Sequence, residues 1–253
     1  MRIASWNVNS IKARLDHVKT WLAAQRPDVL MMQELKGMEF PAGVFKDIGY
    51  ESAFVPQKTY NGVAILSRHK IETVLTSLPG DKADEQARYL EATINGIRLV
   101  NIYLPNGNPV ETEKFTYKLT WLDRLKARLA ALRQEEVPVA VGGDFNVIPE
   151  DIDCYDPALW AADALFRPES RGKFRALLNL GYTDAFRVFN HAPRQYTFWD
   201  YQGGAWPANK GIRIDHFLLS PVLADRLVSC TIDAGPRALD KASDHTPVII
   251  ELN

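Results

Sequence analysis

Two polar residues follow a short apolar run in the middle of the chain, and their types suit the activation of a water molecule. Gly142 and Gly143 close the apolar run, and Asp144 and Asn146 come directly after it. A β-branched run that ends in glycines predicts a buried strand that stops abruptly. Residues two apart in an extended segment point the same way, so the carboxylate and the carboxamide are expected to face one place. Both residue types are also favoured in turns, which leaves an ordinary turn as the alternative.

Three more predicted strands end on polar side chains that could bind a metal ion or a phosphate. These strands and the residues at their ends are 2–6 with Asn7 and Asn9, 29–33 with Glu34, and 97–102 with Tyr103. Functional sites in α/β sheets gather at strand ends. The repetition therefore predicts one site assembled from several strands.

A histidine near the C-terminus extends this set. His245 follows Asp244, and two adjacent side chains diverge from an extended backbone, so His245 needs a carboxylate from elsewhere to hold its tautomer and its charge. Asp215 is the expected partner, because it stands in an otherwise apolar segment where an unpaired carboxylate is costly. The alternatives are a turn histidine and an ion pair of Asp215 with Arg213. His69 and His216 are expected to be structural.

Together these residues could carry out metal-assisted hydrolysis of a phosphodiester. Glu34 and the strand-end carboxylates would hold a hard divalent cation through oxygen atoms, and without a Cys/His cluster zinc is the poorer choice. Asp144 would take a proton from the attacking water while Asn146 orients it. His245, held by Asp215, would donate to a phosphate oxygen as negative charge develops.

The apolar spacing predicts the elements that position these side chains. Helices are expected from Ile11 to Leu22 and from Phe115 to Leu132. Further strands are expected at 51–55, 62–67, 71–76, 89–94, 97–103, 212–219, 227–232 and 248–252, with Asn95-Gly96 as a hairpin turn. Hairpins interleaved with amphipathic helices predict an α/β fold of two packed, mixed, largely antiparallel sheets flanked by helices. Without repeats or linkers, a single domain over 1–253 is expected.

The bulk composition is that of an ordinary globular protein. The 253 residues are 46% hydrophobic and 24% charged, with a formal net charge of −1. This balance gives no general attraction to nucleic acid or membranes, so any positive charge for a polyanion must be local. The first residues lack a signal-peptide pattern, and Cys154 and Cys230 are too few for a disulfide scaffold. A reduced, cytoplasmic setting without membrane contact is expected.

The same residues resemble a known family. The chain is similar to the bacterial exonuclease III type of apurinic/apyrimidinic endonucleases, within the endonuclease/exonuclease/phosphatase superfamily. The resemblance covers essentially the whole length. It is carried by the motifs 5–9 (SWNVN), 33–36 (QELK), 61–64 (NGVA), 103–107 (YLPNG), 143–146 (GDFN), 196–201 (YTFWDY), 211–215 (GIRID) and 243–245 (SDH).

This resemblance implies a four-layered α/β sandwich related to deoxyribonuclease I, with Mg²⁺ or Mn²⁺ as cofactor. It implies Glu34 as the principal metal ligand, and Tyr103 as a group that contacts the phosphate or assists the leaving group. The implied metal set is Asn7, Glu34, Asp144, Asn146, Asp244 and His245; the implied catalytic set is Tyr103, Asp144, Asn146, Asp215 and His245. The implied substrate-binding residues are Asn9, Asn106, Phe198, Trp199 and Ile212, of which Phe198 and Trp199 would line the pocket for an extruded abasic sugar.

The implied activity is cleavage of double-stranded DNA on the 5′ side of an abasic site, with additional action on 3′ ends, by a monomer. Local positive charge for DNA would come from Lys12, Arg14, Lys36, Lys58, Arg171, Lys173 and Lys210. Two departures affect the expected specificity: Leu35 stands where Thr is frequent in the family, and Ile212 stands where some members have Trp.

Two alternatives remain at this stage. A hydrolase of the same superfamily that acts on a lipid headgroup or a nucleotide would share the strand-end residues. The segment 196–201 and the absence of a membrane-binding segment argue against it. A non-catalytic nucleic-acid-binding regulator would be expected to have lost catalytic residues, whereas Glu34, Asp144 and His245 are all present.

Overall fold

The computed structural model describes the backbone of residues 1–253 and every side chain except those of Thr73 and Val74. Its helices are α1 (Ile11–Gln25), α2 (Ala42–Asp47), α3 (Glu113–Gln134), α4 (Pro157–Trp160), α5 (Pro168–Leu178), α6 (Ala185–Phe189) and α7 (Pro221–Ala224). Its strands are β1 (Arg2–Asn7), β2 (Val29–Gln33), β3 (Glu51–Val55), β4 (Val63–Ser67), β5 (Thr73–Leu75), β6 (Tyr89–Ile94), β7 (Ile97–Tyr103), β8 (Val139–Asp144), β9 (Thr183–Asp184), β10 (Asp215–Leu219), β11 (Leu227–Ile232) and β12 (Val248–Leu252).

The strands form two six-stranded sheets. The first has the order β11-β12-β1-β2-β4-β3, and the second has the order β5-β6-β7-β8-β10-β9. Only β1–β2 and β7–β8 pair in parallel among these strands, and all other pairs are antiparallel. The expected mixed, largely antiparallel sheets are confirmed, and each sheet contains one parallel pair whose carboxyl ends share an edge.

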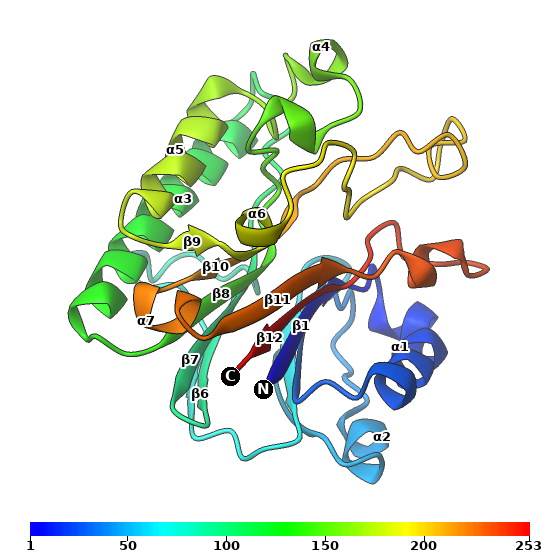
Figure 1. Cartoon of the computed structure of the whole chain (residues 1–253), viewed down its shortest axis with the longest axis vertical. Coiled ribbons are helices and arrows are strands. Elements are labelled where there is room, and N and C mark those ends of the chain that lie inside the picture. Colours follow the sequence, from blue (N-terminus) through cyan, green and yellow to red (C-terminus); the bar gives the residue numbers. More distant parts are fainter.

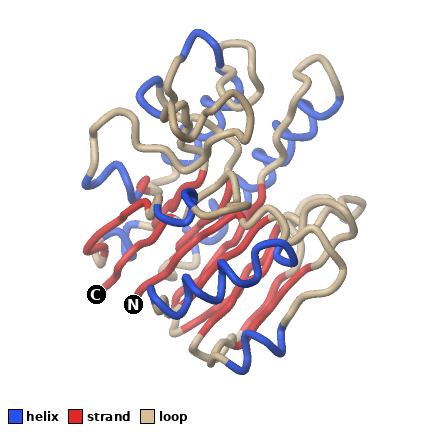
Figure 2. Tube along the Cα trace, turned by 90° about the vertical axis from the view of Figure 1, so that its right-hand side faces the viewer, coloured by secondary structure: helices blue, strands red, loops and turns tan.

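The two sheets pack against each other and helices cover their outer faces, which makes four layers (Figure 1). Alternation along β1 shows why: Ile3 belongs to the core between the sheets, whereas Ala4 and Trp6 pack with Trp21 and Leu22 of α1. Figure 2 shows α1 lying across the strands. On the other outer face, leucines spaced along α3 pack on the second sheet together with residues of α5.

A buried polar contact ties the two sheets together close to the ends of β2 and β7. The Gln33 side-chain amide donates to Asn101 Oδ1 at 2.7 Å and to Ser5 Oγ at 3.1 Å. Asn101 in turn donates to the carbonyls of Met32 and Ala64 at 3.0 and 2.8 Å. Buried polar groups need such partners. These hydrogen bonds fix the distance between the end of β2, which is followed by Glu34, and the end of β7, which is Tyr103.

Three predicted strands are shorter than expected, and the strand predicted at 62–67 begins one residue later, at Val63. The strand predicted at 212–219 begins only at Asp215, because Ile212 pairs instead with Cys154 and Phe198 as isolated bridges. The strand predicted at 71–76 is Thr73–Leu75. The helix predicted from Ile11 to Leu22 continues to Gln25, where Arg26 caps it in a left-handed conformation with φ of 46°.

Candidate active site

Three neighbouring strands of the second sheet place three of the expected residues side by side. Tyr103 at the end of β7 is in register with Asp144 at the end of β8, and Asp144 is in register with Asp215 at the start of β10. Because β10 runs antiparallel to β8, its first residue lies at the edge where β7 and β8 end. Strand pairing therefore brings together side chains that are more than 100 residues apart in the sequence.

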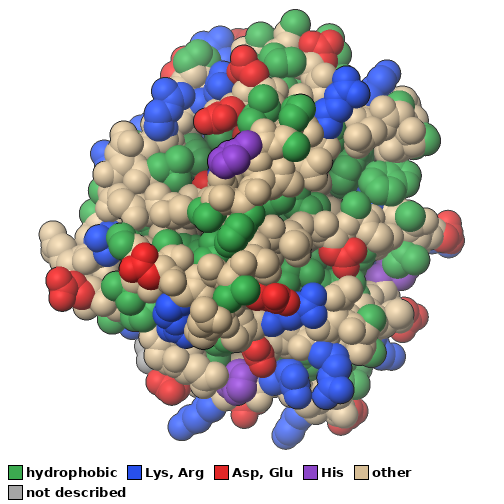
Figure 3. Space-filling model, viewed as in Figure 1, with side chains coloured by type: hydrophobic (Ala, Val, Ile, Leu, Met, Phe, Trp, Pro, Cys, Tyr) green, Lys and Arg blue, Asp and Glu red, His purple; other side chains and the backbone are tan. Residues whose placement is uncertain are grey.

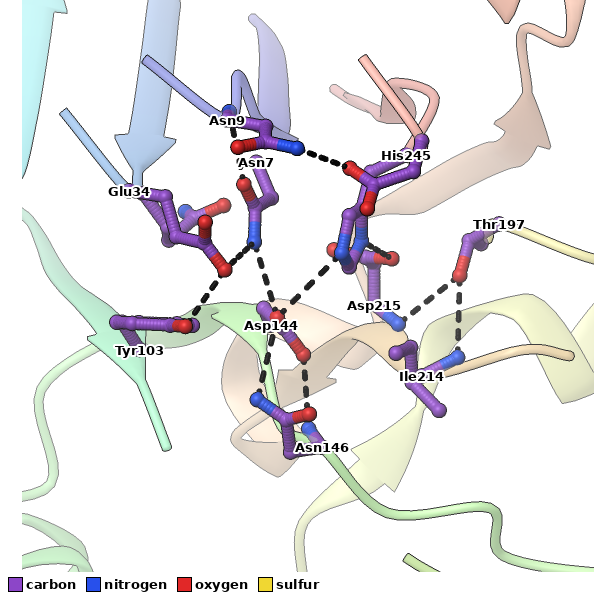
Figure 4. A network of polar contacts seen from close by, with 12 residues as sticks. Asn7, Asn9, Glu34, Tyr103, Asp144, Asn146, Thr197, Ile214, Asp215 and His245 are labelled. Atoms are coloured by element: carbon purple, nitrogen blue, oxygen red, sulfur yellow. Dashed lines mark hydrogen bonds and ion pairs between the residues drawn. The ribbon is translucent and has the colours of Figure 1, made fainter. Parts of the chain in front are cut away.

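The first sheet contributes Asn7 and Glu34 to the same place (Figure 4). The Asn7 side-chain amide donates to Glu34 Oε1 at 3.2 Å and to Asp144 Oδ2 at 3.0 Å. The Tyr103 hydroxyl donates to the same Glu34 oxygen at 2.6 Å. Asn7 thus bridges two carboxylates from different sheets.

His245 takes Asp215 as its partner, as the sequence predicts. Its Nδ1 lies 2.8 Å from Asp215 Oδ2, and its Nε2 lies 3.7 Å from Asp144 Oδ2. The neighbouring Asp244 bonds elsewhere, accepting from the Asn9 side-chain amide at 3.0 Å. The proposed ion pair of Asp215 with Arg213 is absent among the described side chains, because Arg213 binds Asp153 and Asp184 instead.

Asp144 and Asn146 converge by a different route from the one predicted. The strand ends at Asp144, and Asn146 has a positive φ of 46°, so the pair is not extended. The Asn146 backbone N–H donates to Asp144 Oδ1 at 2.8 Å, and its side-chain amide lies 3.3 Å from Oδ2. The structure thus contains the turn that was the alternative interpretation, and this turn presents Asn146 to the Asp144 carboxylate.

These residues line a cavity of about 300 Å³. Glu34, Tyr103, Asn106, Asp144, Asn146, Phe198, Asp244 and His245 are among its lining residues. Trp199 and Ile212 do not line it. Trp199 is only 4% exposed and stacks edge-on against Tyr196 and Trp206, and Ile212 lines a neighbouring cavity with Phe198. Ile214, which the sequence did not single out, is in the cavity wall.

Lys36 and Asn9 join the site from the loops after β2 and β1. The Lys36 ammonium lies 2.7 Å from Glu34 Oε2 and donates to Asn9 Oδ1 at 2.5 Å. Glu34, Asn9 and Lys36 all have positive φ values of 44–55° although none is glycine. Such conformations persist only where surrounding contacts hold them, and they are frequent at functional sites.

Lys118 is a buried residue of α3 that sequence reasoning missed. Its ammonium donates to the carbonyls of Pro105, Asn106 and Asn146 at 3.1, 3.0 and 2.5 Å. Burial lowers the pKa of Lys118 to about 7. Lysine is almost never fully buried unless paired, so a lysine on the apolar face between Phe115 and Leu122 was a signal that could have found it.

Two more contacts missed by the sequence close one wall of the cavity. The Asn108 side-chain amide donates to both carboxylate oxygens of Asp163 at 3.1 Å, and Asn108 Oδ1 accepts from the Ala164 N–H at 3.0 Å. This pairing holds the segment after β7 against the segment before α5. Trp160 and Leu165 beside it complete the lining. No local pattern in the sequence marks these residues.

The basic residues expected to meet DNA lie in different surroundings. Lys36 is in the site, and Arg14 donates to the Asn9 carbonyl at 2.7 Å and to the Tyr201 hydroxyl at 2.9 Å. Lys210 lines the neighbouring cavity, together with Ile212 and Phe198. Lys173 instead bridges α5 to Asp123 of α3 at 2.5 Å, on the outer helical layer.

The site carries opposed charges with clear physical causes. Burial raises the pKa of Asp144, and the nearby Asp215 and Glu34 carboxylates add to the increase. Burial alone would lower the pKa of His245, but the Asp215 and Asp144 carboxylates outweigh it and raise that pKa. Burial alone would raise the pKa of Glu34, but the Lys36 ammonium, the Tyr103 hydroxyl and the His245 charge together outweigh it and lower that pKa. His245 is therefore a cation held between carboxylates.

The donor set fits a hard divalent cation. Five carboxylates line the cavity, from Glu34, Asp144, Asp163, Asp200 and Asp244, and His245 is the one cationic side chain among its described lining residues. A phosphate entering this cavity would meet an excess of negative charge, which a bound cation would neutralise. Carboxylate and amide oxygens are the ligands that Mg²⁺ uses.

Comparison with known proteins places the chain in a family. Residues 4–245 match the Endonuclease/Exonuclease/phosphatase family. The chain therefore belongs to that family, which agrees with the resemblance that the motifs carried and with the observed layered fold.

Individual relatives are similar over their whole length. Exodeoxyribonuclease III of Haemophilus influenzae is 31% identical, with 99% of each chain covered. Among solved structures, a 3′ phosphatase from Neisseria bound to product DNA hairpin is 39% identical with a TM-score of 0.98, covering 100% of this chain and 99% of that one. An AP endonuclease from Archaeoglobus fulgidus is also 39% identical, with a TM-score of 0.96 and the same coverage.

Within the described structure, none of the helices is both long and apolar enough to cross a lipid bilayer.

Proposed function

We propose that this protein is a divalent-metal-dependent DNA repair nuclease that uses Mg²⁺, with Mn²⁺ as a substitute. It hydrolyses the phosphodiester on the 5′ side of an abasic site, leaves a 3′-hydroxyl, and also processes 3′ ends. The observation that carries the proposal is the cluster at the joined strand ends, where Asn7 links Glu34 to Asp144. The relatives named for AP endonuclease and 3′ phosphatase activity are equally similar to this chain, which supports both activities.

Each polar side chain has a role in this proposal. Asp144, kept basic enough by burial to accept a proton, deprotonates the attacking water, and Asn146 orients that water. The attack breaks the bond between phosphorus and the 3′ oxygen of the preceding nucleotide. The His245 imidazolium, held by Asp215 at 2.8 Å, donates to a non-bridging phosphate oxygen.

Glu34 is the principal ligand for the metal, with Asn7, Asp144, Asn146 and Asp244 around it, whereas the His245 imidazolium has no free nitrogen lone pair to offer a metal. A bound Mg²⁺ would polarise the phosphoryl oxygen and offset the developing charge. Tyr103, whose pKa burial and the Glu34 and Asp144 charges raise, stays protonated and so can donate to the leaving oxygen. Asn7 donates to both carboxylates and positions them.

Substrate selection in this proposal depends on the cavity wall. Phe198 and Asn106 line the cavity and contact the sugar–phosphate, while Asn9 lies beside the Asp244 carboxylate. Ile212 packs beside Phe198, whereas Trp199 packs with Tyr196 in a separate cluster. An abasic nucleotide is easy to extrude because it has already lost stacking and pairing, so a cavity of about 300 Å³ favours a sugar without a base. The proposal also includes a single domain over 1–253, a monomeric state and a cytoplasmic location.

The test uses three duplex substrates in parallel: one with an internal stable abasic analogue, one with a recessed 3′-hydroxyl and one with a 3′-phosphate. With Mg²⁺ we expect a single cut 5′ to the abasic analogue and processing of the 3′ ends. Asp144→Asn should lower the rate at least 100-fold, within the range for loss of a general base, while DNA affinity changes less than threefold. The exposed Asp47→Asn on α2 serves as the control. Inaction on all three duplexes, combined with hydrolysis of a lipid-headgroup or nucleotide phosphodiester, would contradict the proposal.

A further inference from the structure

A second cavity lies at the opposite end of the first sheet from the active site. It has a volume of about 770 Å³ and lies between the second half of α1, the turn before β3 and the residues after β4. Asp28 borders it just before β2, whereas Glu34 follows β2 at the other end. The five residues of β2 separate the two, and the six steps from Asp28 to Glu34 span roughly 20 Å at about 3.3 Å per residue. The distal cavity is therefore separate from the catalytic one.

Positive charge predominates in the distal cavity. Lys19, Arg26 and Arg68 line it, and Asp28 is the one carboxylate among its described lining residues. Both Asp28 oxygens are already engaged, one by the Arg2 N–H at 2.7 Å and the other by His69 Nε2 at 3.2 Å. Arg26 and Arg68 form no ion pair with the described carboxylates. Figure 3 shows Lys and Arg side chains on the lower part of this face, with Asp and Glu side chains among them.

The floor of the distal cavity is apolar and fixed. Leu22 is buried, and so is Tyr50, whose hydroxyl donates to the Pro27 carbonyl at 2.7 Å. Ile48 is 43% exposed at its edge. Burial raises the pKa of Tyr50, while the charges of Arg68 and Arg26 act against that increase, and both arginines line the same cavity as Tyr50. Apolar side chains thus adjoin two arginines that have no acidic partner among the described side chains.

A purely structural explanation accounts for only part of this arrangement. Basic side chains near the end of a helix stabilise its exposed carbonyls, and Arg26 is the C-cap of α1, whereas Lys19 lies earlier in that helix. Arg68 belongs to a different segment, after β4, and its backbone N–H bonds to the Asp28 carbonyl at 2.9 Å. Stabilisation of α1 does not explain why Arg68 lines the same cavity.

We propose that the distal cavity is a binding site for a nucleoside 5′-monophosphate, separate from the catalytic site. Arg26 and Arg68 bind the phosphate, because guanidinium groups match phosphate oxygens in pairs. The base lies on the apolar floor beside Tyr50 and Ile48. The volume of about 770 Å³ is within the usual range for small-ligand sites, 300–1,000 Å³.

Titration calorimetry with 5′-AMP in EDTA tests this site without catalytic turnover. We expect saturable binding by the wild-type protein, at least tenfold weaker binding of adenosine, and competition by inorganic phosphate. Arg68→Ala and Arg26→Ala should each weaken 5′-AMP binding at least fivefold. Arg194→Ala, an exposed arginine elsewhere in the chain, is the control and should not change it.

Three results would overturn the proposal. The first is an absence of saturable binding at millimolar 5′-AMP. The second is binding that Arg68→Ala leaves unchanged, which would leave the arginines only a role in helix stability. The third is binding that Glu34→Gln weakens as much as Arg68→Ala does, which would place the nucleotide in the catalytic cavity. A thermal unfolding curve for each variant separates lost binding from lost folding.

Discussion

Lys118 illustrates how one side chain can position several residues of the active site. Its three donors satisfy carbonyls of two segments, Pro105–Asn106 and Asn146, that both border the cavity. The Asn106 side-chain amide also donates to Asn146 Oδ1 at 3.2 Å. The position of the Asn146 side-chain amide, which faces Asp144, therefore depends on Lys118, although Lys118 does not line the cavity.

Replacement of this lysine should affect both catalysis and stability. Lys118→Met leaves three buried carbonyls without a donor, so we expect a loss of about 3 kcal/mol in the free energy of unfolding. We also expect kcat to fall about 10- to 100-fold with a smaller change in KM, because small misplacements at a reacting centre have large effects. Urea unfolding and steady-state kinetics measure the two effects. Lys126→Met, exposed on the same helix, is the control, and an unchanged kcat in the Lys118 variant would contradict the positioning role.

At the residue scale, the sequence predicted the polar groups that end apolar runs. Glu34, Asp144 and the His245–Asp215 pair were all accessible in this way, because a polar residue at a strand end or inside a strand stands out from its neighbours. The positions of Lys118 and Asp163 were not predicted. Their roles depend on contacts with carbonyl and amide groups of distant segments, and the spacing of nearby residues in the sequence does not indicate such contacts.

At the element scale, β8 shows how a glycine permits a close approach of strands. Gly143 has a φ of 147°, and a Cβ there would lie 2.0 Å from the Ile102 carbonyl oxygen of β7. That oxygen belongs to the backbone and cannot move aside without disturbing the β7–β8 pairing that aligns Tyr103 with Asp144. The glycine next to Asp144 is thus a requirement of strand packing.

Gly143→Ala should therefore be strongly destabilising. We expect a loss of more than 3 kcal/mol in the free energy of unfolding, because the strain is at backbone atoms. Gly172→Ala on α5 should instead increase stability by about 0.5–1 kcal/mol, since nothing lies within 4 Å of its Cβ and alanine favours helix. Denaturant unfolding of both variants measures the contrast, and equal stability of the two would contradict this account.

Element prediction succeeded for the long helix and for strands such as 51–55 and 248–252, and it failed for the shortest strand. The helical spacing from Phe115 to Leu132 marks α3 correctly, and the Asn95-Gly96 hairpin joins β6 to β7 as predicted. The two-residue strand β9 has too few residues to show any period. Sheet order was also not predictable from the sequence, because pairs such as β1 with β12 join the two ends of the chain and no local pattern indicates which strands become neighbours.

At the scale of the whole molecule, a buried charge network sets how stability responds to pH. His216 lies against the rings of Phe145 and Phe174, with Nδ1 3.1 Å from Arg213 Nη1 and Nε2 3.0 Å from the Val147 carbonyl. Nε2 donates to that carbonyl and Nδ1 accepts from Arg213, so the ring is neutral. Burial and the Arg213 charge lower the pKa of His216 to about 4.

The sign of the effect follows from proton uptake. Below its ordinary pKa of 6.5 an unfolded His216 binds a proton, while the folded one stays neutral until near pH 4. The unfolded state thus binds more protons between these values, and stability is lost as the pH falls through them. We expect this residue to account for about 2–3 kcal/mol of the loss between pH 7.5 and 4.5. Urea unfolding of His216→Gln at pH 7.5 and pH 4.5 checks this prediction. The variant should lose less unfolding free energy between the two pH values than the wild type does, and an equal loss would contradict the role of His216.

Dependence of DNA cleavage on Mg²⁺ and Glu34 tests the central claim most directly. The measurement is the single-turnover rate on a duplex with one stable abasic analogue, followed on a denaturing gel over a Mg²⁺ titration, for wild type and Glu34→Gln. We predict one cut 5′ to the lesion, no cleavage in EDTA, and at least a tenfold higher Mg²⁺ requirement or a lost rate in the variant, because Glu34 is the principal ligand. Equal cleavage in EDTA, or identical Mg²⁺ curves for the two proteins, would contradict a metal-dependent nuclease site at Glu34.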